Sequence, residues 1–432
     1  MKLFSIIGNP VLHSKSPILF GYAYPNSSNE FAYFRMASQN VSEAMQLFHE
    51  LGLTGMNVTA PFKNDIARLA DVRGPEVEAM QASNTVVLEN GKICAYNTDI
   101  FGVSGSIENG GVTIAGKRCL VLGAGGAGSA AAYALHSKGG EVTIANRTLE
   151  KAAQLAARVG CKACALNEIE KIIPQADLIV NTLYEDVDVV NEAWLKPTHI
   201  IFNAIYHNSK LASKAKKAGC KFIDGAYWLL FQGPPAYRRF TGLEPDLENM
   251  KKALLPQKTP KHIALIGFMG AGKSTVAPLL GRQLNMPVIE VDAVLEQKCG
   301  NTIPHIINEK GEVFFRQKER EVLEEVLASP TPSVISCGGG AVTQPELRKL
   351  LKENSIVVWI YASPEKCVNR IDVPSRPILA RHADPYSAAV ELFEKRKFMY
   401  AQTSWMLVSS NHRTPEQVSN FIYEEVGKVL RG

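Results

Sequence analysis

The chain has 432 residues, of which 46% are apolar and 21% are charged, and its formal net charge is +5. This length exceeds what one hydrophobic core supports and predicts two or three domains, while the composition excludes disordered, collagen-like and low-complexity proteins. Basic and acidic residues are spread along the chain without a Lys/Arg block, so we expect small anionic ligands and no nucleic-acid partner.

Targeting and redox signals point to the cytoplasm. The N-terminal run meets Gly8-Asn9-Pro10 before a signal-peptide core can develop, and the apolar run 356–362 is far shorter than the ~20 residues that span a bilayer. The eight cysteines are irregularly spaced, and Cys161-x-x-Cys164 has no second pair to complete a zinc site. We therefore expect a cytoplasmic protein without a membrane partner.

Short β-rich runs alternate with helical patterns, which predicts an α/β fold with parallel sheets. Strands are expected at 2–7, 117–122, 141–145, 178–181, 199–203, 262–266, 333–336 and 356–361. A basic, Pro-punctuated stretch at 250–261 indicates one domain boundary. A second boundary is expected near residue 100, because a new strand-glycine-helix unit starts at Lys117.

The segment before residue 100 is rich in small polar side chains. It contains Ser14-Lys-Ser16-Pro17, Asn57-Val-Thr59-Ala-Pro61-Phe-Lys63, Asn84-Thr85 and Asn97-Thr98-Asp99. A Lys–Asp pair suits carbonyl reduction, because the developing alkoxide needs a proton and a positive charge beside it. Lys63 and Asp99 alone would fit a surface salt bridge, but the surrounding Ser, Thr and Asn residues favour a pocket for a polyol.

A glycine-rich loop follows the strand expected at 117–122 and precedes a helical stretch at 129–137. Its glycines are Gly123, Gly125, Gly126 and Gly128, and this context is typical of a Rossmann dinucleotide-binding loop. The next strand ends in Asn146-Arg147-Thr148, where an NAD site would place an acidic residue. A guanidinium at this place favours the 2′-phosphate of NADP, although a solvent-facing Arg147 on an NAD site remains the alternative.

A second glycine-rich loop has the phosphate-binding pattern Gly267-x4-Gly272-Lys273-Ser274. It lies between the strand 262–266 and an amphipathic run at 275–284. The backbone of the loop and of the helix start would hold the phosphates of a nucleoside triphosphate, with Lys273 reaching the β and γ groups and Ser274 holding Mg²⁺. The loop residues proposed to contact the nucleotide are Gly270, Ala271, Gly272, Lys273, Ser274 and Thr275.

The acceptor residues of this domain match one family. Residues 262–432 resemble shikimate kinase through the loop, the carboxylate pair Glu290 and Asp292, Glu312-Val-Phe-Phe-Arg316-x-x-Glu319, Gly338-Gly339-Gly340, Trp359-x4-Pro364-Glu365, Arg370, Arg376-Pro377 and Arg396-x3-Tyr400. The resemblance implies a P-loop kinase with a parallel sheet that uses ATP and Mg²⁺.

The same resemblance implies a role for each of these side chains. Arg316 and Arg396 would hold the shikimate carboxylate, while Gly338, Gly339 and Gly340 would approach the ring. Asp292 would orient the attacking hydroxyl, and Glu319 would orient Arg316. Arg370 would contact adenine, and Arg376, in a lid from about 371 to 385, would close on the transferring phosphate. Glu290, which would share Mg²⁺ with Ser274, replaces the family's usual Asp.

Residues 3–250 resemble shikimate dehydrogenase through the Ser, Asn, Thr and Lys motifs above and Gln232. The resemblance implies that Ser14 and Ser16 bind the substrate carboxylate, that Thr59, Asn84 and Gln232 contact ring hydroxyls, and that Lys63 and Asp99 lie beside the reacting carbon. Phe20-Gly21 and the segments 181–187 and 203–208 depart from the family pattern, the two segments on the nicotinamide side.

Together these features predict a two-lobed dehydrogenase followed by a kinase. The expected domains are a substrate-binding lobe at 1–100 plus about 226–250, a Rossmann NADP domain at 101–225, a linker at 251–261 and the kinase at 262–432. The predicted function is NADPH-dependent reduction of 3-dehydroshikimate and ATP-dependent phosphorylation of shikimate to shikimate 3-phosphate, for aromatic amino acid biosynthesis. The alternatives are a quinate-type dehydrogenase with another small-acid kinase, or a non-catalytic ligand-sensing module fused to a working kinase.

Overall fold

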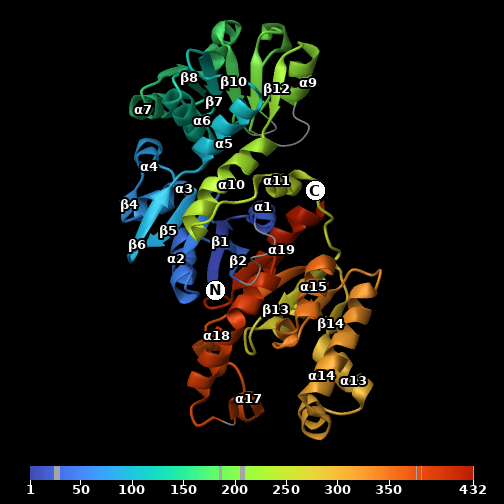
Figure 1. The fold of residues 1–432 in the computed structure, drawn as a ribbon. Coiled ribbons are helices and arrows are strands. Elements are labelled where there is room, and N and C mark those ends of the chain that lie inside the picture. Colours follow the sequence, from blue (N-terminus) through green and yellow to red (C-terminus); the bar gives the residue numbers. More distant parts are fainter. Residues whose placement is uncertain (24–29, 184–186, 205–209, 376, 381, 432) are drawn as a thin grey trace. The chain divides into compact units, whose positions relative to one another are not determined.

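The computed structural model describes residues 1–431 except 24–29, 184–186, 205–209, 376 and 381 (Figure 1). The chain forms two compact units: the first joins 1–17 and 26–54 to 257–432, and the second contains 18–25 and 55–256. Across the described ranges, every helix is too short or too polar to cross a bilayer. Because each unit draws on distant parts of the sequence, the two units are described separately.

A seven-stranded parallel sheet runs through the first unit. Its order is β14 (Val288–Glu290), β15 (Val334–Ser336), β13 (His262–Ile266), β16 (Ser355–Tyr361), β17 (Met406–Ser409), β2 (Phe31–Ala37) and β1 (Lys2–Gly8). β13 and β16 are buried along their whole length, as Val- and Ile-rich central strands of a parallel sheet are. The predicted parallel kinase sheet is therefore confirmed, and N-terminal strand β2 extends it.

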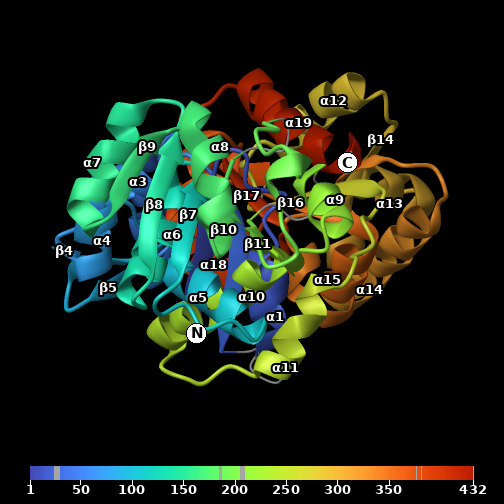
Figure 2. The same cartoon turned by 90° about the horizontal axis from the view of Figure 1, so that it is seen from above.

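Helices pack around this sheet. Figure 2 shows α12 (Lys273–Leu284) and α19 (Pro415–Arg431) side by side, and Figure 1 shows α18 (Pro385–Thr403) beside β2. The others are α2 (Val41–Glu50), α13 (Val291–Cys299), α14 (Ile303–Ala328), α15 (Pro345–Asn354), α16 (Pro364–Asn369) and α17 (Pro377–Ala380). The predicted lid contains α17 and a short 3₁₀ turn, and Arg376 lies outside the described residues.

The second unit contains a six-stranded, wholly parallel sheet. Its order is β12 (Lys221–Asp224), β11 (Ile200–Asn203), β10 (Leu178–Asn181), β7 (Arg118–Leu122), β8 (Glu141–Asn146) and β9 (Lys162–Ala165). This is the doubly wound order of a Rossmann fold, with the first strand, β7, at the centre next to β10 and β8. The predicted Rossmann fold is confirmed. The helices are α5 (Asp99–Asn109), α6 (Gly126–Ser137), α7 (Leu149–Val159), α8 (Ile169–Ile172), α9 (Lys210–Lys217) and α10 (Ala226–Thr241).

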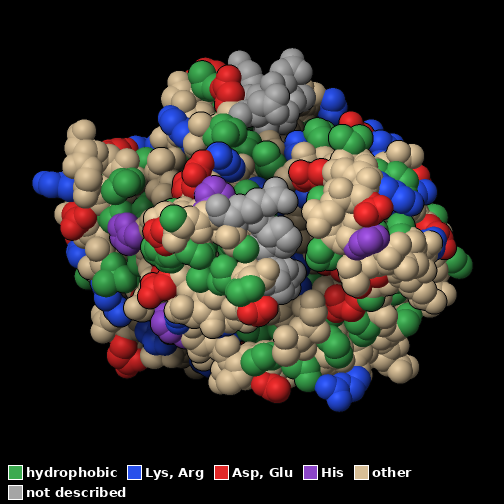
Figure 3. Space-filling model, turned by 90° about the horizontal axis from the view of Figure 1, so that it is seen from below, with side chains coloured by type: hydrophobic (Ala, Val, Ile, Leu, Met, Phe, Trp, Pro, Cys, Tyr) green, Lys and Arg blue, Asp and Glu red, His purple; other side chains and the backbone are tan. Residues whose placement is uncertain are grey.

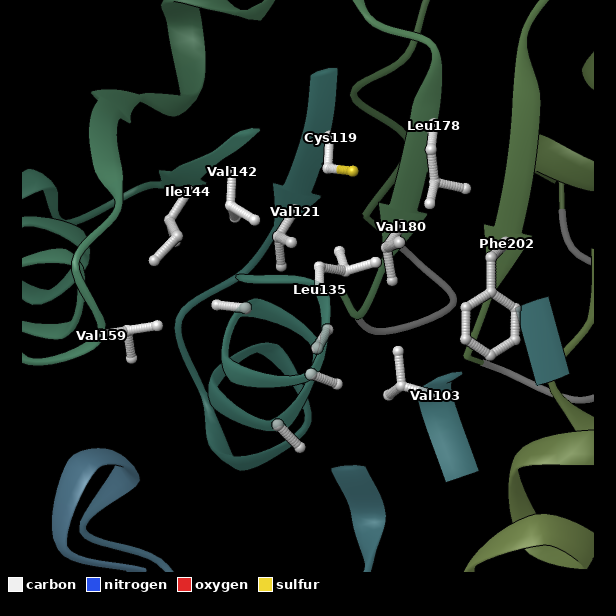
Figure 4. Close-up of a cluster of buried hydrophobic side chains, with 14 of the residues drawn as sticks. Val103, Cys119, Val121, Leu135, Val142, Ile144, Val159, Leu178, Val180 and Phe202 are labelled. Atoms are coloured by element: carbon white, nitrogen blue, oxygen red, sulfur yellow. The ribbon is translucent and has the colours of Figure 1, made fainter. Parts of the chain in front are cut away.

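The core on one face of this sheet lies between the strands and α6 (Figure 4). Val121, Val180 and Phe202 project from neighbouring strands, and Leu135 projects from α6; all four are buried. Most of the buried side chains of α6 are alanines, so the helix can pack close to the sheet. This close packing places the glycine-rich loop at the start of α6 directly above the end of β7.

A four-stranded segment of β-sheet in the second unit contains antiparallel pairs, which the sequence patterns did not predict. Its order is β3 (Gly55–Val58), β5 (Thr85–Glu89), β6 (Lys92–Tyr96) and β4 (Val72–Arg73); the pairs β3·β5 and β5·β6 are antiparallel. Asn90 and Gly91 join β5 to β6 with φ of 52° and 76°, the backbone of a tight hairpin turn. The remaining helices are α3 (Lys63–Leu69), α4 (Pro75–Met80), α11 (Leu247–Met250) and α1 (Ser16–Ala23), which belongs to the second unit from residue 18 onward.

Candidate active sites

An ion pair joins the first residues of two helices in the second unit. Lys63 Nζ, at the start of α3, donates to Asp99 Oδ2, at the start of α5, over 2.6 Å. Trp228 Nε1, from α10, donates to the other oxygen of Asp99 at 3.1 Å. The side chain of Asp99 is 5% exposed and that of Lys63 20% exposed. The carboxylate is therefore fixed by two donors, and the ammonium it holds still reaches solvent.

Amide side chains form a buried network beside this pair. Asn84 Nδ2 donates to Gln232 Oε1 at 3.3 Å and to Thr98 Oγ1 at 3.2 Å, and Asn84 Oδ1 accepts from the backbone N–H of Thr98 at 2.7 Å. Thr98 directly precedes Asp99, so this network also fixes the start of α5. The structure thus brings together Asn84 and Gln232, two predicted substrate residues. Thr59 lies in the turn before Lys63, where its carbonyl accepts from Phe62 N at 3.1 Å.

Ser14 and Ser16 lie in the first unit, at and just before the start of α1. Ser14 Oγ donates to Ser16 Oγ at 3.3 Å, so the two hydroxyls adjoin each other. The carbonyl of Ser14 accepts from Arg35 Nε at 2.9 Å and from Arg35 Nη2 at 2.6 Å. The turn that carries the two serines is therefore anchored to β2.

The dinucleotide loop requires its glycines for steric reasons. Gly123 has φ of 109°, and a Cβ on Gly128 would lie 2.1 Å from the carbonyl oxygen of Gly123. Gly125 precedes α6, and Gly126 begins it. A Cβ on Gly126 would lie 3.5 Å from Lys63 Cδ, so the loop adjoins the Lys63–Asp99 pair. This arrangement can place a bound nicotinamide nucleotide next to the ammonium group.

The residues after β8 fit a nucleotide that carries a 2′-phosphate. Asn146 Oδ1 accepts from Ala124 N at 3.2 Å, and Asn146 Nδ2 donates to the carbonyl of Thr148 at 2.9 Å, which ties this turn to the loop. Arg147 is exposed and borders a cavity of about 560 Å³. Within the described part of the chain, that cavity has no carboxylate lining, and its other residues are Ala165, Leu166, Asn167, Ile169, Val189 and Trp194.

The two segments that depart from the dehydrogenase family pattern, 181–187 and 203–208, begin at the ends of β10 and β11. Asn181 Nδ2 donates to Asn203 Oδ1 at 2.8 Å, and Asn181 Oδ1 accepts from Leu183 N at 3.2 Å. Both asparagines are buried, so their amides hold the two strand ends together. The rest of these segments, residues 184–186 and 205–209, lies outside the described residues.

The phosphate loop of the first unit borders a cavity of about 460 Å³. Gly267, Gly270 and Gly272 have φ of 149°, 78° and 104°, and a Cβ on Gly270 would lie 2.4 Å from the carbonyl oxygen of Cys367. Lys273 Nζ donates to the carbonyl oxygens of Gly267 at 2.9 Å and Phe268 at 3.1 Å, which holds the ammonium inside the loop. The predicted nucleotide residues Gly270–Thr275 and Arg370 all line this cavity.

Oxygen ligands suited to Mg²⁺ line the same cavity. They are Ser274, Glu290 and Asp292. Glu290 Oε1 is buried, and no hydrogen-bond partner for it exists among the described residues. A buried carboxylate oxygen without a partner costs free energy, whereas a hard cation with oxygen ligands would satisfy it. The residues present therefore fit a magnesium ion, and Glu290 fits in place of Asp.

The predicted acceptor residues converge on the turn Gly338–Gly340. Arg316 Nη1 donates to Glu319 Oε2 at 2.7 Å, and a Cβ on Gly340 would lie 2.4 Å from Arg316 Nη2. On the neighbouring glycine, Gly338, a Cβ would lie 2.9 Å from Asp292 Oδ1. Glu319 is fully buried, which raises the pKa of its carboxyl; Arg316 opposes this shift and Asp292 adds to it. This geometry agrees with Glu319 orienting Arg316.

The second predicted arginine reaches the same turn from α18. Arg396 Nη1 donates to the carbonyl oxygen of Gly339 at 3.4 Å, and Tyr400 OH donates to that oxygen at 2.6 Å. Arg370, which lines the same cavity, donates through Nη2 to the carbonyl of Ser410 at 2.8 Å. The guanidinium groups of Arg316 and Arg396 thus both adjoin the turn Gly338–Gly340, an arrangement that suits a carboxylate ligand.

Sequence reasoning missed several residues of these sites. Trp228 lies 129 positions after Asp99, and no local motif marks it. Ser410, Arg413, Pro415 and Val418 line the nucleotide cavity after β17. Their place after a strand could have indicated these residues, because ligands of α/β proteins bind beyond the carboxyl ends of the strands.

Fold and sites define a Rossmann dehydrogenase joined to a P-loop kinase of small ring carboxylates. Residues 6–86 match the family described as shikimate dehydrogenase substrate binding domain, residues 107–206 match shikimate / quinate 5-dehydrogenase, and residues 269–427 match shikimate kinase. The chain belongs to the shikimate dehydrogenase family, with a shikimate kinase domain fused to it.

Individual proteins show the same likeness. The NADP(+) shikimate dehydrogenase of Aquifex aeolicus is 37% identical over 252 residues, which cover 56% of this chain and 92% of that protein. A crystal structure of the Aquifex aeolicus enzyme has a TM-score of 0.56 at 34% identity, covering 59% of this chain and 98% of that one. The Thermus thermophilus enzyme, solved in complex with NADP(H) and shikimate, has a TM-score of 0.54 at 30% identity with the same coverage. The predicted bifunctional shikimate-pathway enzyme is thereby confirmed.

Proposed function

We propose that this chain reduces 3-dehydroshikimate to shikimate with NADPH and then phosphorylates shikimate to shikimate 3-phosphate with ATP. The observation that carries the proposal is that each nucleotide loop adjoins its own acceptor residues. The Lys63–Asp99 pair lies beside the dinucleotide loop. Arg316 and Arg396 flank the glycine turn that lines the phosphate-loop cavity.

In the reductase, the chain's own residues bind the substrate and handle one proton. Bound NADPH would supply the hydride. Lys63 Nζ provides a positive charge and a proton for the oxygen that becomes a hydroxyl, while Asp99, held by Trp228, keeps the ammonium in place. We assign Ser14 and Ser16 to the substrate carboxylate and Thr59, Asn84 and Gln232 to its hydroxyls. Gly123, Gly125, Gly126 and Gly128 would hold the pyrophosphate, and Asn146, Arg147 and Thr148 the 2′-phosphate.

In the kinase, catalysis is mainly positioning and charge stabilisation. Asp292 orients the attacking hydroxyl and accepts its proton, and Lys273 carries positive charge to the transferring group. We assign Arg316, Arg396 and Gly338–Gly340 to shikimate, and Arg370 to adenine. Mg²⁺, held by Ser274 and Glu290, would neutralise phosphate charge. A role for Arg376 in the lid remains a proposal from the family resemblance.

Quinate is a second candidate substrate of the reductase. The family matched by residues 107–206 is described as shikimate / quinate 5-dehydrogenase, a description that names both acids. A substrate panel with shikimate and quinate, each with NADP⁺ and NAD⁺, decides between them. We expect NADP⁺ to give a higher kcat/KM than NAD⁺ with either acid, because Arg147 is exposed beside a cavity without acidic lining among its described residues.

The domain division and the cellular setting complete the proposal. We retain a substrate lobe at 1–100 plus about 226–250, a Rossmann domain at 101–225, a linker at 251–261 and a kinase at 262–432. All eight cysteines are free thiols, which supports a cytoplasmic location. On the face shown in Figure 3, the described Lys and Arg side chains are interspersed with Asp and Glu, which supports small molecules rather than nucleic acid as partners.

One coupled assay tests both activities. The purified chain is given 3-dehydroshikimate, NADPH and MgATP, and shikimate and its phosphate are followed separately. K63A and D99N should abolish NADPH oxidation while leaving phosphorylation of added shikimate intact, and D292N should do the reverse. A wild-type chain that phosphorylates shikimate but never oxidises NADPH would instead support a ligand-sensing module.

A further inference from the structure

Helix α2 of the N-terminal segment contacts the loop between β17 and α19 of the kinase, within the first unit. The main contact is an ion pair between Glu43 of α2 and Arg413, in which Arg413 Nη2 donates to Glu43 Oε2 at 2.7 Å and Nη1 donates to the other oxygen. The side chains of Arg413 and Glu43 are only 10% and 18% exposed. Such a pair is screened less by solvent than an ordinary surface salt bridge.

A second carboxylate of α2 contacts the same loop. Glu50 Oε2 accepts from Asn411 Nδ2 at 3.0 Å and from Tyr361 OH at 2.9 Å. Asn411 Oδ1 in turn accepts from the backbone N–H of Ser363 at 2.8 Å, and Ser363 caps α16. Glu50 therefore holds both the β17–α19 loop and, through Asn411, the start of the helix that leads to Arg370.

These contacts continue into the nucleotide cavity. Arg413, Ser410 and Pro415 of the loop line it, and so does Arg370, whose guanidinium donates to Ser410. On the kinase side, Arg413 is held by the carbonyl of Ser409 at 2.9 Å and by the ring of Phe421, whose centroid lies 4.6 Å from its Cζ. Glu43 supplies the only carboxylate that pairs with Arg413 among the described residues.

We propose that Glu43 and Glu50, which belong to the dehydrogenase part of the sequence, are positioning residues for the kinase's nucleotide site. They hold Arg413 and Asn411 so that the loop 410–415 keeps the shape of the cavity wall. The inference rests on the proposed kinase function, and it makes α2 a working part of that kinase. Among the described hydrogen bonds, these contacts lead to Arg370, which we assign to adenine, and to none of the residues assigned to shikimate. We therefore expect them to affect the affinity for ATP and to leave shikimate binding unchanged.

The test uses full-length variants and separates the two substrates. E43Q keeps one side-chain oxygen, which can still accept from Gln39 N as Glu43 Oε2 does at the start of α2. It removes the negative charge and replaces the second oxygen that accepts from Arg413 with an N–H donor. We expect E43Q and E50Q each to raise the KM for ATP and the Kd for ATP in calorimetric titration about three- to tenfold, with kcat and the KM for shikimate within about twofold of wild type. E43D should restore part of the affinity.

A matched control is E324Q, which breaks another Arg–Glu pair, Arg320–Glu324, whose residues do not line the cavity. It should leave the KM for ATP unchanged, and the dehydrogenase KM and Tm report whether each variant is folded. An unchanged or lower KM for ATP in both E43Q and E50Q, or equal losses for ATP and shikimate, overturns the inference. A wild-type chain that does not phosphorylate shikimate would instead refute the proposed function.

Discussion

At the scale of single residues, Trp228 has a role that the sequence does not mark. Its indole N–H donates to Asp99, while its ring stacks on Phe202 with centroids 5.8 Å apart. W228F keeps an aromatic ring at this position but removes the hydrogen bond to the carboxylate and part of the buried indole volume. We expect the dehydrogenase kcat to fall about ten- to hundredfold, since a hydrogen bond to a charged group contributes about 1.5–3 kcal/mol. Steady-state kinetics with 3-dehydroshikimate measures this, and Y227F, on the same helix, should leave kcat unchanged.

Glu319 makes stability depend on pH. Burial raises the pKa of its carboxyl above the value in the unfolded chain, although Arg316 opposes the shift. The folded state therefore binds the proton more tightly, and this contribution to stability is complete below the unfolded pKa and is lost as pH rises through the folded pKa. The glutamine of E319Q does not titrate, so the stability of E319Q should not fall over this pH interval as that of the wild type does. The Tm of E319Q minus the Tm of the wild type should therefore increase as the pH rises. Scanning calorimetry from pH 4 upward checks the sign.

The same substitution should weaken shikimate binding. Gln carries no charge to hold the Arg316 guanidinium, which Glu319 binds at 2.7 Å. We expect the KM for shikimate to rise about tenfold at neutral pH, with the KM for ATP nearly unchanged. An E319Q enzyme with wild-type shikimate affinity would show that Glu319 does not position Arg316.

At the scale of elements, two glycines of one loop should behave differently. A Cβ on Gly128 would lie 2.1 Å from a backbone carbonyl, whereas a Cβ on Gly125 has no atom within 4 Å in the described structure. G128A should therefore destabilise the second unit by about 1–3 kcal/mol and abolish NADP binding. G125A should keep the wild-type Tm and lose only cofactor affinity, because the bulk is added where the backbone approaches the pyrophosphate. Calorimetry and NADP⁺ titration of both variants separate the two effects.

The helices and strands also show which parts of the fold the sequence predicted. β13, with its unbroken apolar run, has the predicted bounds, and β16 begins one residue earlier than predicted. The hairpin β5–β6 was missed although Asn90-Gly91 is a turn signal. The predicted helix at 129–137 started too late, because the glycines with which α6 begins, Gly126 and Gly128, are typical of a loop. Motif spacing and the family resemblance pointed to Arg316, Asp292 and Lys63, whose roles stay predictions. They could not find Trp228, Glu43 or Arg413, whose roles exist only through contacts between distant segments.

At the scale of the whole chain, the kinase sheet includes strands from the N-terminus. β2 pairs with β17 from Met406↔Arg35 to Val408↔Ala37. Glu425 of α19, 1% exposed, accepts from the backbone N–H groups of Val11 at 3.0 Å and Leu12 at 2.9 Å. The segments 1–17 and 30–54 are therefore expected to unfold together with the kinase.

E425A tests this shared folding. The substitution leaves two buried N–H groups without their acceptor, which costs about 2–3 kcal/mol and should lower the Tm of the kinase transition by about 4–12 °C. Its neighbour on the same helix provides the control, since Glu424 is exposed and E424A should shift that transition by less than about 1 °C. Kinase activity measured after each temperature step identifies the transition.

The pairing of β2 with β17 also affects how the protein responds to proteolysis. Residues 255–259, between the two enzymes, are exposed, so a protease can cut the chain there. The cut would separate the enzymes in sequence, yet the C-terminal fragment would still be hydrogen-bonded to strands of the N-terminal one. A nicked preparation should therefore elute from a sizing column at the position of the intact chain and separate into two bands only in denaturant.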